Sequence, residues 1–290
     1  MLFGAHVSSA SGIAKAIDRI EAIGGDAVQV FTQSPQMWKS TEHAPEELER
    51  FRTRRNEARV RYVACHALYL VNLASRDADI RSKSHAALCA TMETARGLDA
   101  DAVVFHVGSH LGFGFDEAVQ LVVPALRDLL ELTSERLWLC LENAAGAGGT
   151  IGRSVDELGV LLEAVDAHPR LGICLDSCHW WASGVDVTDA AVLEDALGEL
   201  DSRIGLERLR LLHVNDARTP LGSNVDRHEV VAEGVLGDGL ATFLGHPAFR
   251  ELPAVLETHP KDGLSRADVD LLKNLYRRGR RRKRPASSRR

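Results

Sequence analysis

The sequence predicts a single-domain (β/α)8 barrel, and three observations lead to this fold class. Short aliphatic or β-branched runs alternate with longer segments of helical spacing, eight times in 290 residues. The short runs do not alternate apolar with polar residues, as expected for strands that are covered on both faces. No Gly- or Ser-rich linker divides the chain. A doubly wound open sheet is the alternative arrangement of the same elements.

Eight segments are predicted as strands because each is an aliphatic or β-branched run bounded by polar turns. In chain order they are residues 2–7, 27–32, 61–67, 102–107, 137–143, 171–175, 209–214 and 254–258. Helical spacing predicts helices over residues 11–24, 45–59, 76–98, 115–134, 154–167, 188–205, 239–250 and 265–278. Start signals support several helices, since Ser154 precedes Asp156 and Pro45 precedes Glu46. Residues 217–239 form an unusually long connection, and such connections are typically functional or disordered.

Composition separates an acidic body from a basic end. Residues 277–290 contain nine Lys and Arg and no acid, which leaves 26 basic against 41 acidic side chains before them, a net charge of −15. We therefore predict a barrel domain over residues 1–276 and a basic, disordered tail over residues 277–290. Charge alone would not predict that so acidic a domain binds nucleic acid.

The sequence also predicts a cellular compartment. No apolar run reaches the roughly 18 residues of a membrane helix, and the N-terminal residues lack the features of a signal peptide. Five cysteines lie inside apolar segments, which is typical of reduced core thiols: Cys65, Cys89, Cys140, Cys174 and Cys178. We expect a monomeric cytoplasmic protein without membrane contact or structural disulfides.

Residues of metal-ligand type stand at the ends of the last six predicted strands. They are His66, His106, Glu142, Asp176, His213 and Glu257. Barrel enzymes build their sites at this end of the strands. Three further candidates are nearby: His179 lies one turn beyond Asp176, and Asp226 and His228 lie on one side of an extended segment.

Five imidazoles and four carboxylates are too many ligands for one tetrahedral ion. They suit two or three ions that share a carboxylate, and nitrogen and oxygen donors favour Zn²⁺ or Mn²⁺. Four carboxylates packed together would repel one another without bound positive charge, so the composition predicts a metal site at the C-terminal mouth of the barrel. The alternative is that individual histidines only cap strands or satisfy hydrogen bonds in the core.

With these residues in view, the sequence resembles the endonuclease IV family of apurinic/apyrimidinic (AP) endonucleases. The matching segments are residues 4–8, 66–74, 105–110, 141–146, 174–179, 213–216, 222–223, 225–229 and 256–258. The resemblance implies three zinc ions per chain, with Mn²⁺ as a substitute. It assigns His66 and His106 to the first ion, Asp176, His213 and Glu257 to the second, His179, Asp226 and His228 to the third, and Glu142 as a bridge between the first two.

The same resemblance implies the reaction and the substrate, which is duplex DNA containing abasic sites. A water activated between the first two metals and oriented by the catalytic Glu142 would attack the phosphorus 5′ to the abasic site. The products would be 3′-hydroxyl and 5′-deoxyribose phosphate ends, and trimming of blocked 3′ ends is a second expected activity. An abasic nucleotide has no base to read, so selection is expected to use bending of the DNA and flipping of the sugar.

DNA contacts are expected from two loops. By position, Tyr69 and Leu70 would wedge into the duplex. Residues 31–38 also match the family, but Gln36 stands where many members have Arg, and Met37 follows it. Gln36 lacks the cationic stacking of a guanidinium, so we expect weaker DNA affinity, for which the basic tail could compensate through salt-dependent contacts to any duplex.

A second layer of residues matches family positions near the same strand ends. We expect these residues to hold the metal ligands in place or to bind phosphate: His6, Ser109, His110, Asn143 and Asn215. Two alternative functions stay open, a two-metal sugar isomerase or epimerase of a related barrel and a non-catalytic DNA-damage-binding protein. The third ligand set, His179, Asp226 and His228, argues against the isomerase, and the complete set of nine argues against a protein that only binds.

Overall fold

The computed structural model describes residues 1–258 and 260–282, and its long strands close into one parallel barrel. The barrel strands are β1 (Leu2–His6), β2 (Ala27–Phe31), β3 (Tyr62–His66), β4 (Ala102–Phe105), β5 (Trp138–Glu142), β6 (Leu171–Asp176), β7 (Leu209–His213) and β10 (Pro253–Leu256). β1 pairs with both β2 and β10, which closes the sheet. All eight predicted strands are therefore confirmed, and the open doubly wound sheet is excluded.

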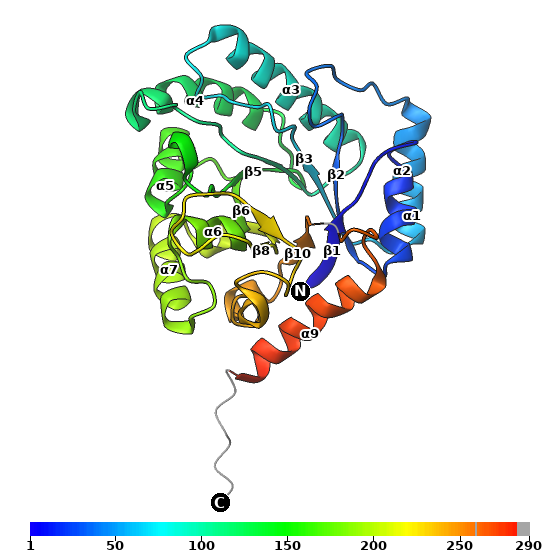
Figure 1. Ribbon diagram of the computed structural model, residues 1–290. Helices are drawn as coiled ribbons and strands as arrows, with labels where there is room; N and C mark the ends of the chain where they lie inside the picture. Colours follow the sequence, from blue (N-terminus) through cyan, green and yellow to red (C-terminus); the bar gives the residue numbers. More distant parts are fainter. Residues whose placement is uncertain (259, 283–290) are drawn as a thin grey trace, which may run out of the picture.

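Helices surround the barrel and cover its outer face (Figure 1). They are α1 (Lys15–Ala22), α2 (Pro45–Glu57), α3 (Ala78–Gly97), α4 (Phe115–Leu130), α5 (Val155–Ala164), α6 (Ser177–Ser183), α7 (Ala190–Arg203), α8 (Leu240–Leu244) and α9 (Arg266–Arg282). Short 3₁₀ helices connect some of them: Ala147–Gly149, Leu206–Arg208, Gly237–Gly239 and Pro247–Phe249. A two-stranded antiparallel ribbon of β8 (Asp216–Ala217) and β9 (His228–Glu229) lies between β7 and α8.

The interior of the barrel is filled by a layer of mostly small side chains. This buried cluster consists of Ala27, Tyr62, Ala64, Ala102, Val104, Cys140, Cys174 and Leu211. The larger core packs between the strands and the helices. Since successive side chains of a strand point to opposite faces, the residue two positions beyond each interior residue also points inward, toward the C-terminal mouth.

The structure departs from the predicted helices at α8 and at α6. The helix predicted over residues 239–250 is broken, because α8 ends at Leu244 and Pro247 starts a separate 3₁₀ turn. Helix α6 was not predicted, because it is only 7 residues long and begins directly after β6 without a polar turn.

The C-terminal helix extends further than the sequence predicts. Helix α9 runs to Arg282, beyond the predicted helix end at residue 278, so residues 277–282 of the predicted tail are helical. The helix is held there because Leu275 is buried, Tyr276 packs edge-on against Phe3 and Arg278 pairs with Asp238 at 2.8 Å. Residues 283–290 of the predicted tail lie outside the described residues.

All five cysteines are free thiols, as predicted. Across residues 1–258 and 260–282, helices long and apolar enough to cross a membrane are absent.

Candidate metal centre

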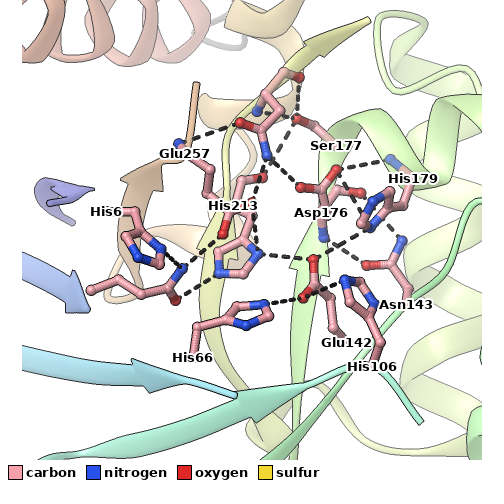
Figure 2. A network of polar contacts seen from close by, with 12 residues as sticks. His6, His66, His106, Glu142, Asn143, Asp176, Ser177, His179, His213 and Glu257 are labelled. Carbon is pink, nitrogen blue, oxygen red and sulfur yellow. Dashed lines mark hydrogen bonds and ion pairs between the residues drawn. The ribbon is translucent and has the colours of Figure 1, made fainter. Parts of the chain in front are cut away.

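The strand pattern brings the predicted ligands to one place at the mouth of the barrel. His66 lies two residues beyond interior Ala64, and Glu142 two residues beyond interior Cys140. The same spacing relates His106 to Val104, Asp176 to Cys174 and His213 to Leu211. The predicted strand-end residues therefore share the inward face and point toward one another (Figure 2).

Glu142 stands at the centre of this cluster and is 1% exposed. Its Oε2 lies 3.1 Å from Nε2 of His66 and 3.4 Å from Nε2 of His106. Its Oε1 lies 2.9 Å from Nδ1 of His213 and 3.3 Å from Nδ1 of His179. Each carboxylate oxygen thus faces a different pair of imidazoles.

A second set of ligand atoms lies on the β6, β7 and β10 side of Glu142. Nδ1 of His213 is 3.3 Å from Oε2 of Glu257. Asn215 Nδ2 donates to Asp176 Oδ2 at 2.6 Å and to Glu257 Oε2 at 3.0 Å, which holds the two carboxylates side by side. These groups are fully or largely buried, so their orientation is fixed by packing as well as by hydrogen bonds.

The third set combines α6 with the long connection after β7. Asp176 Oδ1 accepts the N–H of His179 at 2.8 Å and so caps α6, which turns His179 toward the mouth. Nε2 of His179 lies 3.3 Å from Asp226 Oδ2 and 3.3 Å from Nε2 of His228. Asp226 Oδ1 is 3.1 Å from the same nitrogen of His228.

The ligand atoms form groups that could each hold an ion, with all atoms of a group within 4.8 Å of one another. The groups are His66, His106 and Glu142; Glu142, Asp176, His213 and Glu257; and His179, Asp226 and His228. The structure thus brings together all nine predicted residues in the predicted sets. A further overlapping group, Asp176, Cys178 and His228, includes a thiol that sequence reasoning assigned only to the core.

Carboxylates and imidazoles shift one another's pKa values in this buried cluster. Burial alone would raise the pKa of Glu142, but His106 and His213 outweigh burial and lower it. Burial would likewise raise the pKa of Glu257, yet His213 lowers it to about 2. Burial would lower the pKa of His213, but Glu257 and Glu142 raise it to about 9. The cluster therefore favours ionised carboxylates and demands positive charge next to them.

The donor chemistry fits bound divalent cations. Each group of three or four combines carboxylate oxygens with imidazole nitrogens, and one buried carboxylate is shared by two groups. Metal ions bind the neutral imidazole and the ionised carboxylate, so they would replace the protons that the histidines otherwise hold. This combination of imidazole nitrogens and carboxylate oxygens is well suited to Zn²⁺.

One residue of the site was missed by sequence reasoning. Gln29 of β2 is fully buried and donates from Nε2 to Glu257 Oε1 at 2.7 Å, with His6 Nδ1 at 3.1 Å. Because its NH₂ group faces a carboxylate, its carbonyl oxygen faces Nε2 of His213, at 2.8 Å. That nitrogen must therefore carry a hydrogen, which leaves Nδ1 of His213 as the ligand atom. An amide inside the apolar run 27–31 was the available signal.

The residues expected in the second layer divide into two kinds. His6 contacts Gln29, Asn215 contacts Asp176 and Glu257, and Asn143 Oδ1 accepts the Asp176 N–H at 2.6 Å. These three hold ligand-bearing segments. Ser109 and His110 instead brace the loop after β4: the Ser109 hydroxyl donates to Gly148 O at 2.6 Å, and His110 Nδ1 accepts the Gly112 N–H at 3.1 Å.

The four expected DNA-contact residues lie in two adjacent loops at the mouth. Tyr69 and Met37 are 63% and 55% exposed, Leu70 is 37% exposed and Gln36 is exposed. Tyr69 N–H donates to the Pro35 oxygen at 3.0 Å, which ties the two loops together. A cavity of about 380 Å³ is lined by most of the candidate ligand residues and by Tyr69.

An exposed leucine in the neighbouring loop was not predicted. Leu111 is 75% exposed and has a φ of +46°, a strained conformation for a branched residue. Its N–H donates to the Ser109 hydroxyl at 3.0 Å, which helps to fix this conformation. The signal in the sequence is an apolar residue directly before Gly112.

Comparison with known proteins assigns the family. A family model described as a xylose isomerase-like TIM barrel matches residues 17–275. A probable endonuclease 4 of Chloroflexus aurantiacus is 35% identical over 277 residues, which cover 94% of this chain and 97% of the relative. A probable endonuclease 4 of Methanoculleus marisnigri is 39% identical over 260 residues, which cover 89% and 92%. The chain belongs to the endonuclease IV family.

Solved structures agree with membership of the endonuclease IV family. The crystal structure of endonuclease IV from Thermus thermophilus matches with a TM-score of 0.84 and 32% identity, covering 97% of this chain and 100% of that chain. A D-tagatose 3-epimerase-like protein matches with a TM-score of 0.72 at 19% identity, which shows a shared fold alone.

Proposed function

We propose that this protein is a zinc-dependent AP endonuclease that hydrolyses the phosphodiester 5′ to abasic sites in duplex DNA. The products would be 3′-hydroxyl and 5′-deoxyribose phosphate ends. One observation carries the proposal: the two oxygens of Glu142 face two different ligand groups, and a third group lies in the same cavity. The names of the endonuclease 4 relatives support it.

The residues that would hold the ions follow the three groups. His66 and His106 would hold one zinc, Asp176, His213 and Glu257 a second, and His179, Asp226 and His228 a third, with Glu142 shared by the first two. When bound, clustered ions supply an activated water, polarisation of the phosphate oxygens and stabilisation of the leaving oxygen. Mn²⁺ would be tolerated because it accepts the same nitrogen and oxygen donors.

The chain's own side chains orient this chemistry. Glu142 is buried with a lowered pKa, so it would stay ionised and could orient the attacking water. Gln29 and Asn215 fix the ring of His213 and the carboxylates of Asp176 and Glu257. A site held in this way needs little rearrangement when the substrate arrives.

Substrate selection would use the loops at the mouth. Tyr69, Leu70 and Met37 present apolar surface that could fill the space left by a missing base. Beside the metal centre, a second cavity of about 670 Å³ shares His6 and Phe31 with it and is lined by the hydroxyl-bearing Ser8, Ser9 and Ser11. Such a surface suits the phosphate backbone of a strand that passes the site.

The decisive experiment uses a duplex with one tetrahydrofuran abasic analogue, which cannot be cut by β-elimination. We expect hydrolysis 5′ to the analogue, about three zinc ions per chain, and loss of cleavage after chelation. Glu142→Gln should abolish cleavage without unfolding the protein, whereas Glu199→Gln, an exposed change on α7, should cut at the wild-type rate. A Glu142→Gln variant that cuts normally would refute the mechanism.

The same preparation distinguishes the alternatives. Two metals per chain, an intact duplex and turnover of a ketose would favour the sugar isomerase. Damage-specific binding without cleavage by the metal-loaded wild type would favour a protein that only binds. A duplex with a 3′-phosphate end tests the second expected activity, trimming of blocked 3′ ends.

A further inference from the structure

The long connection between β7 and α8 folds around one buried carboxylate. Asp216 of β8 is fully buried, and its two oxygens accept five backbone N–H groups. The donors are Ala217 (2.8 Å) and Leu236 (2.8 Å) to Oδ1, and Ala232 (3.1 Å), Gly234 (3.1 Å) and Gly237 (2.9 Å) to Oδ2. Four of these donors come from residues 232–237, so the carboxylate takes the place of a paired strand for this segment.

The local backbone conformation depends on these hydrogen bonds. Ala232 has a φ of +70°, which is strained for a residue with a side chain. Gly234 lies so close to the carboxylate that an added Cβ would come within 2.5 Å of Asp216 Oδ1. Such a conformation persists only where its surroundings determine it, and here the Asp216 oxygens do so together with the backbone hydrogen bond from Val235 N–H to Ala217 O at 2.8 Å.

The connection that contains Asp216 also carries two metal-ligand candidates, Asp226 and His228, outside the segment 232–237 that Asp216 binds directly. Ala217, next to Asp216, is the strand partner of His228 in the β8–β9 ribbon, and Asp226 lies two residues before His228. The N–H of Arg218 donates to Arg227 O at 2.9 Å, which extends the ribbon toward Asp226. The other ligand candidates lie in or next to barrel strands, or on the capped helix α6. Asp226 and His228 are therefore the candidates whose positions depend on the fold of the loop.

We propose that Asp216 is a positioning residue for the third metal-ligand group. Its carboxylate fixes the shape of residues 216–237, and this shape places Asp226 and His228 beside His179. The proposal rests on the proposed function, because it assumes that this group binds zinc. Asp216 itself binds no metal in this scheme, since its oxygens are engaged by backbone N–H groups.

The test compares two buried or partly buried carboxylates at opposite ends of the barrel. Asp216→Asn replaces one acceptor oxygen by an NH₂ group that would face backbone donors. Asp101→Asn is the control: Asp101 lies just before β4 and accepts from Arg55 at 2.7 Å and the Val63 N–H at 2.8 Å. Both substitutions should lower the melting temperature.

Zinc binding should separate the two variants. After chelation, each protein is titrated with Zn²⁺ against a chromophoric chelator. We expect Asp216→Asn to weaken one of three sites by roughly 10- to 100-fold and Asp101→Asn to keep all three. In the zinc-free protein, hydrogen exchange of residues 226–237 should rise in Asp216→Asn alone.

A second variant disturbs the contact without changing the carboxylate. Gly234→Ala forces a Cβ against both Ala217 O and Asp216 Oδ1 and should weaken the same zinc site, whereas Gly198→Ala on α7, where a Cβ meets nothing within 4 Å, should not. Three unchanged zinc sites in both Asp216→Asn and Gly234→Ala would overturn the positioning role. A wild-type protein that takes up no zinc would instead refute the metal centre, and the positioning role with it.

Discussion

Replacing Gln29 by leucine tests how the metal-ligand atoms are oriented. The substitution keeps the approximate volume of a fully buried side chain but removes its hydrogen bonds to His213 at 2.8 Å and Glu257 at 2.7 Å. A buried N–H left without an acceptor costs about 1–3 kcal/mol, and a lost hydrogen bond to a charged group about 1.5–3 kcal/mol. We therefore expect Gln29→Leu to lower the free energy of unfolding of the zinc-free protein by roughly 2.5–6 kcal/mol.

The effect on zinc should go beyond stability. Without the Gln29 oxygen, either nitrogen of His213 can carry the hydrogen, so the affinity of the group containing His213 should fall by roughly 10- to 100-fold. Urea denaturation measures the first quantity and chelator competition the second. Val28→Ala, on the opposite face of the same strand, is the matched control. It should lower the free energy of unfolding without changing the zinc affinity. Equal zinc affinity in both variants would show that Gln29 does not select the ligand nitrogen.

Three further predictions concern the mouth, the C-terminus and the thiols. Gln36→Arg should tighten binding to an abasic duplex by about 2- to 5-fold, because an exposed guanidinium that stacks on a base contributes about 0.5–1 kcal/mol; unchanged fluorescence anisotropy titrations would contradict this. Substituting Lys283, Arg284, Arg289 and Arg290 by serine should reduce the slope of log affinity against log salt by up to about 4, and an identical slope would remove these residues from DNA binding. Burial raises the pKa of Cys65 and Cys140 to about 12, so at pH 8 these thiols stay protonated and unreactive; only the half-buried Cys89 should react with Ellman's reagent in the native protein, and all five thiols in urea.

The fold was predictable because its strands are apolar runs that polar turns interrupt at regular intervals. The clustering of the strand-end residues was predictable for the same reason, since Glu142 and His213 end runs whose inner faces are otherwise small or apolar. In a closed parallel barrel all strand ends of one kind meet at one mouth, so the one-dimensional pattern already implies a three-dimensional cluster.

What the sequence did not predict depends on contacts between distant residues. In the sequence, Gln29 is a single polar residue in a predicted strand. Its place in the site follows from its hydrogen bond with His213, which lies 184 positions away. The predicted end of α9 came too early because a run of arginines predicts a solvated tail. In the structure, Arg278 forms an ion pair with Asp238, and the Tyr276 ring packs edge-on against Phe3. The composition of a short segment cannot predict contacts with residues far away in the sequence.

The connection after β7 is the part of the chain that favours a nuclease over a sugar isomerase. The fold does not discriminate, because the epimerase-like neighbour shares it at 19% identity. The two groups joined by Glu142 do not discriminate either, because a two-metal proton transfer would use the same strand ends. His179 also faces Glu142, but residues 216–237 bring Asp226 within 3.3 Å of its Nε2 and so complete a third ligand group. In the proposed function, the ligand group that distinguishes phosphodiester hydrolysis from proton transfer is therefore added by this loop, on a barrel that both reactions share.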